Sequence, residues 1–100
     1  MDLNSQPQPI NPNNFQTMVM QGKTVIQIDA AWNQANHYRW TPAMGVKYYE
    51  VTLDQYPELK NKFNVKSVPM ILVFMNGKEV KRYEGGLTFR ITVPQSEILK

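Results

Sequence analysis

Hydrophobic residues occur along this chain in short runs that are separated by turn-forming residues. Residues 24–30 are rich in β-branched side chains, which predicts a strand, and residues 46–53 alternate between apolar and polar, which predicts a second one. Residues 70–75 are apolar throughout, as is typical of a strand buried on both faces. The dipeptide Asn76-Gly77 follows at once and predicts a tight hairpin, with residues 78–84 as the return strand.

Three other stretches indicate helices. Residues 15–20 predict a short helix that is closed by Gly22. Residues 31–43 carry helix formers and aromatic residues and predict a helix of two or three turns, and residues 57–63 begin with proline and have helical spacing. Alternating helices and strands that end in a hairpin predict an α/β fold with a mixed sheet of four or five strands.

The two ends of the chain have different patterns. Residues 1–14 contain three prolines, four asparagines and two glutamines, which predicts a flexible tail, or alternatively an arm that docks along a partner. The domain is expected to span residues 15–100. Within it, residues 88–93 have an extended pattern, and residues 94–99 resemble the start of a helix.

Composition supports one globular domain and excludes several kinds of chemistry. The 100 residues are 42% hydrophobic and 19% charged, with 11 Lys and Arg against 8 Asp and Glu. This net charge of +3 is too small to favour a dedicated nucleic-acid binder. The absence of cysteine excludes a thiolate nucleophile, a disulfide and a cysteine-ligated metal, and His37 is the only histidine. We therefore expect no metal and no cofactor.

No apolar run is long enough to span a bilayer, and the N-terminal residues lack the pattern of a secretory signal. These observations predict a cytoplasmic protein with no membrane partner.

Three landmarks in residues 15–86 resemble the thioredoxin family. The first is a strand that runs into Ala-x-Trp, here residues 25–32. The second is the segment around the family's cis-proline, here residues 63–69, which is followed by a buried strand. The third is the Asn76-Gly77-Lys78 hairpin with a return strand that ends at Gly85. The resemblance implies a thioredoxin-like three-layer sandwich.

The departures from the family concern its chemistry. The two positions that match its Cys-x-x-Cys motif are Asn33 and Asn36, and Gln27 matches its buried carboxylate. An asparagine amide is neither nucleophilic nor redox-active, so these degenerate active-site positions cannot carry out thiol–disulfide exchange. Because the acid is missing together with both thiols, the sequence favours a chain that is redox-inert by nature over one whose cysteines were engineered out.

A second departure concerns length. Only about fourteen residues separate Pro42 from Pro57, and the last helix is barely begun at Lys100. The second and terminal helices are therefore expected to be short. Since both cover the same face of the sheet in the family, this face is expected to be under-covered, which makes a homodimer through it a possible outcome.

The resemblance also implies a surface for a protein or an extended peptide. Thioredoxins grip peptides through a ring, the cis-proline segment and a glycine that allows close approach. The matching positions in this chain are Trp32, Asn33, Gln34, Ala35, Asn36, Val68, Pro69 and Gly85. The alternative is that Trp32 only caps its loop and Pro69 only sets a turn.

Residues 37–40, with the sequence His-Tyr-Arg-Trp, allow two interpretations. They are either a patch that faces RNA or protein, or a helix whose Tyr38 and Trp40 pack on the sheet while His37 and Arg39 are solvated.

Three functions remain open at this point. The first is a redox-inactive thioredoxin-fold module for protein interaction or structure, which would not be an enzyme. The second is a thioredoxin-type oxidoreductase by lineage, with the motif replaced by Asn33-Gln34-Ala35-Asn36. The third is an RNA-associated structural subunit of a large particle.

Overall fold

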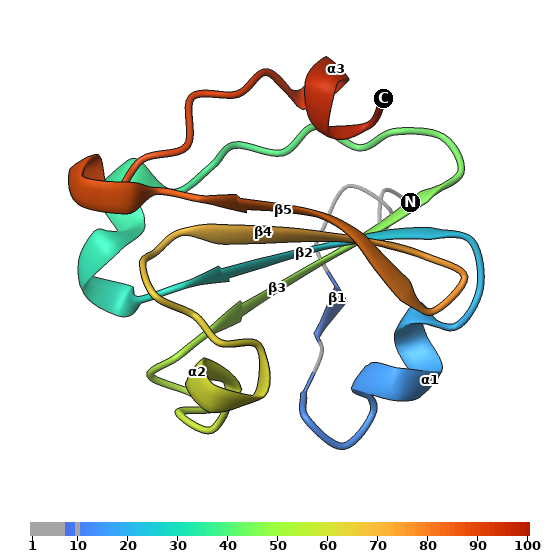
Figure 1. The fold of residues 1–100 in the computed structure, drawn as a ribbon, viewed down its shortest axis with the longest axis horizontal. Coiled ribbons are helices and arrows are strands. Elements are labelled where there is room, and N and C mark those ends of the chain that lie inside the picture. Colours follow the sequence, from blue (N-terminus) through green and yellow to red (C-terminus); the bar gives the residue numbers. More distant parts are fainter. Residues whose placement is uncertain (1–7, 10) are drawn as a thin grey trace.

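A computed structural model describes residues 8, 9 and 11–100, and these contain a single five-stranded sheet in the order β1-β3-β2-β4-β5 (Figure 1). The strands are β1 (Gln8–Pro9), β2 (Lys23–Asp29), β3 (Val46–Thr52), β4 (Met70–Met75) and β5 (Lys78–Glu84). The β1, β3 and β2 strands are parallel, whereas β4 is antiparallel to both β2 and β5. The predicted mixed sheet and α/β class are confirmed.

The hairpin between β4 and β5 has the geometry expected for Asn-Gly. Asn76 and Gly77 both have positive φ, 52° and 88°, which matches the right-handed twist of the flanking strands. The side-chain oxygen of Asn76 also accepts a hydrogen bond of 2.8 Å from the main-chain N–H of Gly22. The hairpin is thereby joined to the turn that precedes β2.

All helices in the described part of the chain are short. They are α1 (Phe15–Val19), the 3-10 helix η2 (Ala31–Asn36), α2 (Leu59–Lys62), the 3-10 helix η3 (Gly86–Thr88) and α3 (Gln95–Ile98). None of them is long and apolar enough to cross a membrane. Residues 88–93, whose pattern is extended, form no strand, and the short helix expected in residues 94–99 is present as α3.

The prediction of a helix over residues 31–43 is wrong beyond Asn36. The backbone turns extended at His37, where ψ is 135°. The side chain of Gln27 then takes both main-chain groups of Tyr38: its oxygen accepts from the N–H at 2.9 Å and its amide donates to the C=O at 3.0 Å. Pro42 has no N–H to donate and disfavours a helical conformation in the residue before it. Residues 37–45 therefore contain no helix and cross the sheet, and we call them the strap.

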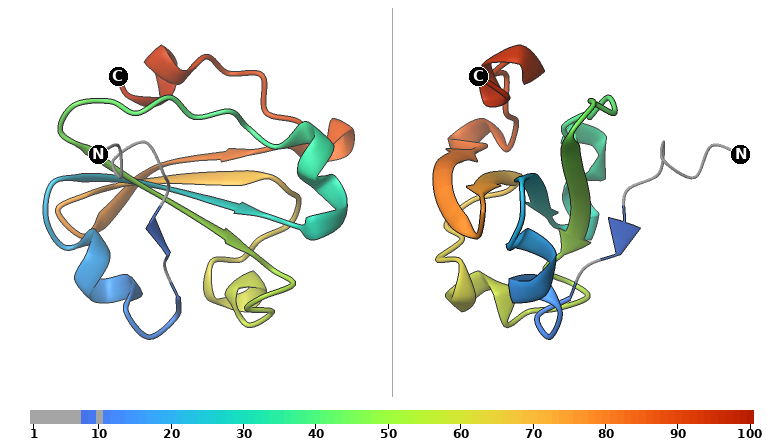
Figure 2. Two further views of the ribbon diagram at one scale, coloured as in Figure 1. Left: turned by 180° about the vertical axis from the view of Figure 1, so that it is seen from behind. Right: turned by 90° about the vertical axis from the view of Figure 1, so that its right-hand side faces the viewer.

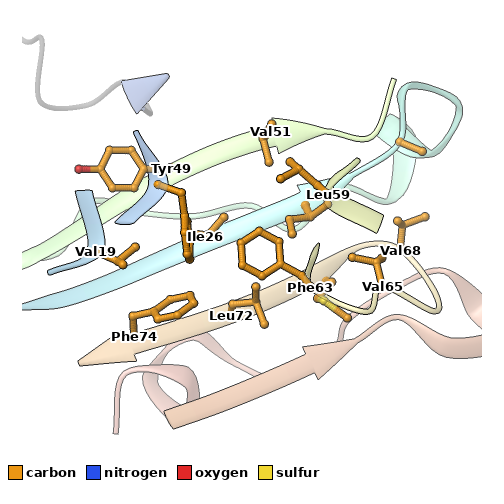
Figure 3. Close-up of a cluster of buried hydrophobic side chains, with 14 residues drawn as sticks. Val19, Ile26, Tyr49, Val51, Leu59, Phe63, Val65, Val68, Leu72 and Phe74 are labelled. Atoms are coloured by element: carbon orange, nitrogen blue, oxygen red, sulfur yellow. The ribbon is translucent and has the colours of Figure 1, made fainter. Parts of the chain in front are cut away.

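One face of the sheet carries the larger hydrophobic core, beneath α1 and α2 (Figure 3). Phe15 of α1 packs edge-on against two rings, with centroid distances of 4.7 Å to Phe63 and 5.3 Å to Phe74. Ile26 and Leu72 of the central strands lie beneath these rings and are buried. The aromatic cluster holds both short helices on the sheet.

The expectation of an under-covered opposite face is wrong for the central strands. Val25, Ile71 and Val73 are at most 1% exposed there. The strap and the C-terminal segment cover them, on the side of the sheet opposite α1 and α2 (Figure 1, Figure 2). The covering side chains include Tyr38, Trp40, Ile91, Val93, Ile98 and Leu99. Burial of this face removes the bare surface on which the homodimer prediction depends.

Part of the predicted flexible tail has defined structure. Gln8–Pro9 pairs with Tyr49 and Glu50 of β3, and the side-chain oxygen of Asn11 accepts hydrogen bonds from two main-chain N–H groups in the turn before α1. For these residues the structure shows a strand and a turn where a tail is expected. Residues 1–7 and 10 lie outside the described residues.

Candidate functional site

The predicted site residues come from three loops at one end of the sheet. Trp32 lies in η2 after β2, Val68-Pro69 precedes β4, and Gly85 follows β5. The Val68–Pro69 peptide bond is cis. Gly85 donates a main-chain hydrogen bond of 2.9 Å to the carbonyl oxygen of Pro69, which joins two of these loops.

Gly85 lies so close to its neighbours that no larger residue fits. A Cβ atom at this position would be 2.6 Å from the carbonyl oxygen of Val68, 2.8 Å from the main-chain nitrogen of Arg90 and 2.9 Å from Cδ of Pro69. Its φ is −70°, so the reason for glycine here is close approach of the backbone rather than a left-handed conformation. These distances show that the main chain of Gly85 lies close to the neighbouring loop, but they do not test whether a peptide also approaches it.

Three large apolar side chains in or just after η2 and η3 are exposed, and we call Trp32, Leu87 and Phe89 the aromatic shelf. The rings of Trp32 and Phe89 meet edge to face, with centroids 5.1 Å apart. Trp32 is 66% exposed, Leu87 98% and Phe89 40%. Sequence analysis misses Leu87 and Phe89, because they follow the last strand in a segment with no clear periodicity.

The two asparagines at the cysteine positions have structural roles. Asn33 is only 2% exposed, and its amide donates to Asp29 Oδ1 at 3.1 Å and to the carbonyl oxygen of Phe89 at 3.1 Å. Asn36 donates to Asn33 Oδ1 at 3.0 Å and accepts from Arg90 at 2.7 Å. Asn33 therefore does not present itself to a partner, whereas Gln34 and Ala35 between them are exposed.

The single histidine is not solvated as one interpretation expects. His37 lies between two carboxylates, with Nδ1 2.8 Å from Asp29 Oδ2 and Nε2 2.8 Å from Glu50 Oε2. Because a carboxylate oxygen accepts and does not donate, both ring nitrogens must carry a proton in this arrangement. No pattern near residue 37 indicates this contact, since Asp29 and Glu50 belong to two different strands.

The pKa values follow from these contacts. Hydrogen bonds to Asp29 and then Glu50 raise the pKa of His37 from 6.5 to about 9, although partial burial opposes the rise. Burial raises the pKa of Glu50, but hydrogen bonds from His37 and Tyr48 outweigh it, so the net shift is downward. Burial and the bond to Glu50 raise the pKa of the Tyr48 hydroxyl well above its usual range. At neutral pH the cluster thus holds an imidazolium and a neutral phenol.

Gln27, at the position of the family's buried carboxylate, is fully buried, and both polar atoms of its side chain form hydrogen bonds. Its amide donates to the Tyr48 hydroxyl at 2.6 Å, in addition to its two bonds with Tyr38. The hydroxyl in turn donates to Glu50 Oε2 at 2.7 Å. Polar atoms are costly to bury unless paired, and this arrangement pairs them without a charge on Gln27.

Tyr38 and Trp40 follow the packing interpretation of residues 37–40. The ring of Trp40 stacks on Tyr48 at 4.8 Å, and the Tyr38 hydroxyl donates to the carbonyl oxygen of Val93 at 2.6 Å. Both rings cover the sheet and do not form a free stacking platform for bases. Among the described residues, no group of three or more His, Asp and Glu side chains is arranged to hold a metal ion.

Comparisons with known proteins agree with this architecture. The family model for thioredoxin matches residues 6–92. A search of curated protein sequences found no match. Oxidised thioredoxin from Plasmodium falciparum is 15% identical, with 79% of this chain and 85% of that chain covered and a TM-score of 0.61.

Two other solved structures are similar. The thioredoxin of Malassezia sympodialis is 18% identical, covers 80% of this chain and 79% of its own, and has a TM-score of 0.64. A designed protein is 17% identical, with 96% and 95% covered and a TM-score of 0.68. At these identities the structures establish the fold, and the family model covers most of the chain. The chain therefore belongs to the thioredoxin family, and it lacks both active-site cysteines of that family.

Proposed function

We propose that this chain is a redox-inactive thioredoxin-fold protein that binds extended, apolar peptide segments of partner proteins at the aromatic shelf. The observation that carries the proposal is the exposed edge-to-face pair of Trp32 and Phe89, with the exposed side chain of Leu87 two residues before Phe89 in the chain. Large exposed apolar side chains that are clustered in one place mark interaction sites more often than scattered ones do. The chain has no thiol of its own, so binding here would proceed without thiol–disulfide exchange.

The neighbouring main chain supports an extended ligand. In the described part of the chain, no hydrogen bond uses the N–H or the C=O of Val68. Val68 is 5% exposed as a whole residue, and we infer that a peptide strand laid beside it would pair with these two main-chain groups, which is β-augmentation. Alternate side chains of such a strand would point the same way, so apolar residues two apart would reach the shelf together.

Replacing Trp32 with alanine is expected to weaken peptide binding at least tenfold. Aromatic residues at the centre of an interface carry much of the binding free energy, and tenfold corresponds to about 1.4 kcal/mol. Linear 12-residue peptides would be selected from a phage-displayed library, and their dissociation constants measured by fluorescence polarisation. Met44→Ala is the control, because Met44 is apolar and fully exposed but lies in the strap between η2 and β3. Failure to select any peptide, or equal weakening by both variants, would refute the proposal.

Restoring cysteine at both positions is expected to leave the chain almost inactive, at less than 1% of the insulin-reduction rate of a cysteine-containing thioredoxin. A thiolate in place of Asn33 would face the buried Asp29 carboxylate, which lies 3.1 Å from the present amide, and this would raise its pKa. The Asn33→Cys, Asn36→Cys variant would be assayed with the unchanged chain as blank. A rate within tenfold of thioredoxin would support the alternative of an oxidoreductase by lineage. The RNA-associated alternative stays a prediction.

A further inference from the structure

A continuous set of hydrogen bonds runs from His37 to the aromatic shelf. Asp29 is fully buried and holds His37 through Oδ2. Its other oxygen accepts from the main-chain N–H of Ala30 at 2.8 Å and from the amide of Asn33 at 3.1 Å. The same Asn33 amide donates to the carbonyl oxygen of Phe89 at 3.1 Å. The orientation of Asp29 therefore sets where Asn33 can hold the backbone of Phe89.

The backbone of Phe89 has an unfavourable conformation that a hydrogen bond would help to maintain. Its φ is 55°, which lies in the left-handed region that bulky L-residues rarely adopt. In this conformation its ring packs on Trp32, and its carbonyl oxygen accepts the bond from Asn33, which lies 56 positions earlier in the chain. Without that bond, the backbone at Phe89 would gain by relaxing to negative φ, and the ring pair would separate.

We propose that His37 is a positioning residue for the peptide-binding shelf, whose two ring protons keep Asp29, Asn33 and Phe89 in the arrangement that places the Phe89 ring against Trp32. This inference rests on the proposed function of the shelf. It also assigns to the asparagine at the first cysteine position the task of linking a buried charge cluster to the binding surface.

The charges that face His37 explain why the proton matters. Asp29 approaches from β2, and Glu50, which also accepts from Tyr48, approaches from β3. The guanidinium group of Arg90, in the C-terminal segment, donates a hydrogen bond to Asn36 and forms none with the His37 ring. A neutral imidazole would turn a lone pair toward one carboxylate oxygen at 2.8 Å and leave the fully buried Asp29 and the partly buried Glu50 without a cation between them. One carboxylate would have to move.

Peptide affinity is expected to fall at high pH. The shelf is expected to be intact at pH 6 to 8 and to loosen as the pH rises through the pKa of His37 at about 9. The dissociation constant of a peptide selected at pH 7 should rise at least fivefold between pH 8 and pH 10 while the chain remains folded by circular dichroism.

The decisive experiment is an NMR titration of the unaltered chain from pH 6 to pH 10.5. The sole histidine gives one imidazole signal, and the Trp32 indole signal is assigned with a Trp32→Phe variant. We expect the imidazole, the Trp32 indole and the Phe89 ring to shift with one midpoint near pH 9, whereas the methyl signal of Met44 does not follow. A midpoint near 6.5 for the imidazole, or aromatic signals that do not move with it, would overturn the inference.

The variant Asn33→Ala removes the hydrogen bond from Asn33 to Phe89 and leaves His37, Asp29 and Glu50 in place. In Asn33→Ala, His37 should still titrate near pH 9, but the Trp32 and Phe89 signals should no longer follow it. Persistent coupling in this variant would overturn the assigned route. If selected peptides bind equally at pH 8 and pH 10, the inference fails and the proposed function stands. If the signals are coupled but no peptide binds at pH 7, the proposed function fails and only the internal link remains.

Discussion

Replacing Gly85 with alanine is expected to lower the free energy of unfolding by about 3 kcal/mol, at the upper end of the usual cost of overpacking. The new Cβ would meet the Val68 carbonyl oxygen at 2.6 Å and the Arg90 nitrogen at 2.8 Å. Both are main-chain atoms, which cannot rotate away, so the loops before β4 and after β5 must separate. Urea unfolding followed by tryptophan fluorescence measures the loss.

Gly45→Ala is the matched control for this substitution. Gly45 has a φ of +77°, and a Cβ added there would have no neighbouring atom within 4 Å, so alanine would incur backbone strain alone. Such strain costs on the order of 1 kcal/mol. Equal losses in the two variants would show that close approach at Gly85 is not what excludes a side chain. Because the Val68 main chain would be displaced, Gly85→Ala should also weaken peptide binding, which Gly45→Ala should not.

Replacing His37 with glutamine is expected to lower the free energy of unfolding by about 2 kcal/mol at pH 6. A rise in pKa from 6.5 to about 9 would correspond to about 3 kcal/mol, and solvent screening of a side chain that is 21% exposed reduces it. Since the folded-state pKa is raised, this contribution is fully present below pH 6.5 and is lost as the pH rises through 9. The difference between the two proteins should therefore shrink below about 1 kcal/mol at pH 10.

Urea unfolding of both proteins at pH 6, 8 and 10 checks this result. Arg39→Gln is the control, because Arg39 is an exposed cation two positions away that forms no ion pair in the described part of the chain. Its replacement should change the free energy of unfolding by less than about 0.5 kcal/mol at each pH. A His37→Gln difference that is independent of pH would mean that the imidazolium is not the stabilising species.

The candidate site was partly predictable through the resemblance to the thioredoxin family. Trp32, Pro69 and Gly85 match three landmarks of that family: a ring after a buried strand, a proline before one, and a glycine after a hairpin. Phe89 and Leu87 match no such landmark, and their exposure depends on where the C-terminal segment crosses the sheet. Asn33 was expected at the surface with its neighbours, but the hydrogen bonds to Asp29 and Phe89 draw it inside.

The sequence by itself determined β2, β3, β4 and β5, the hairpin and the loss of thiol chemistry, but not β1. Periodicity, β-branched runs and Asn-Gly act over a few residues, and the absence of cysteine needs no structure at all. Only the tertiary structure decided that residues 37–43 form no helix, that the second sheet face is covered, and that His37 carries a proton between Asp29 and Glu50. Each of these depends on residues that lie far apart in the chain. Asp29 and Glu50, for example, meet at His37 because of the register between β2 and β3, and not because of spacing along the chain.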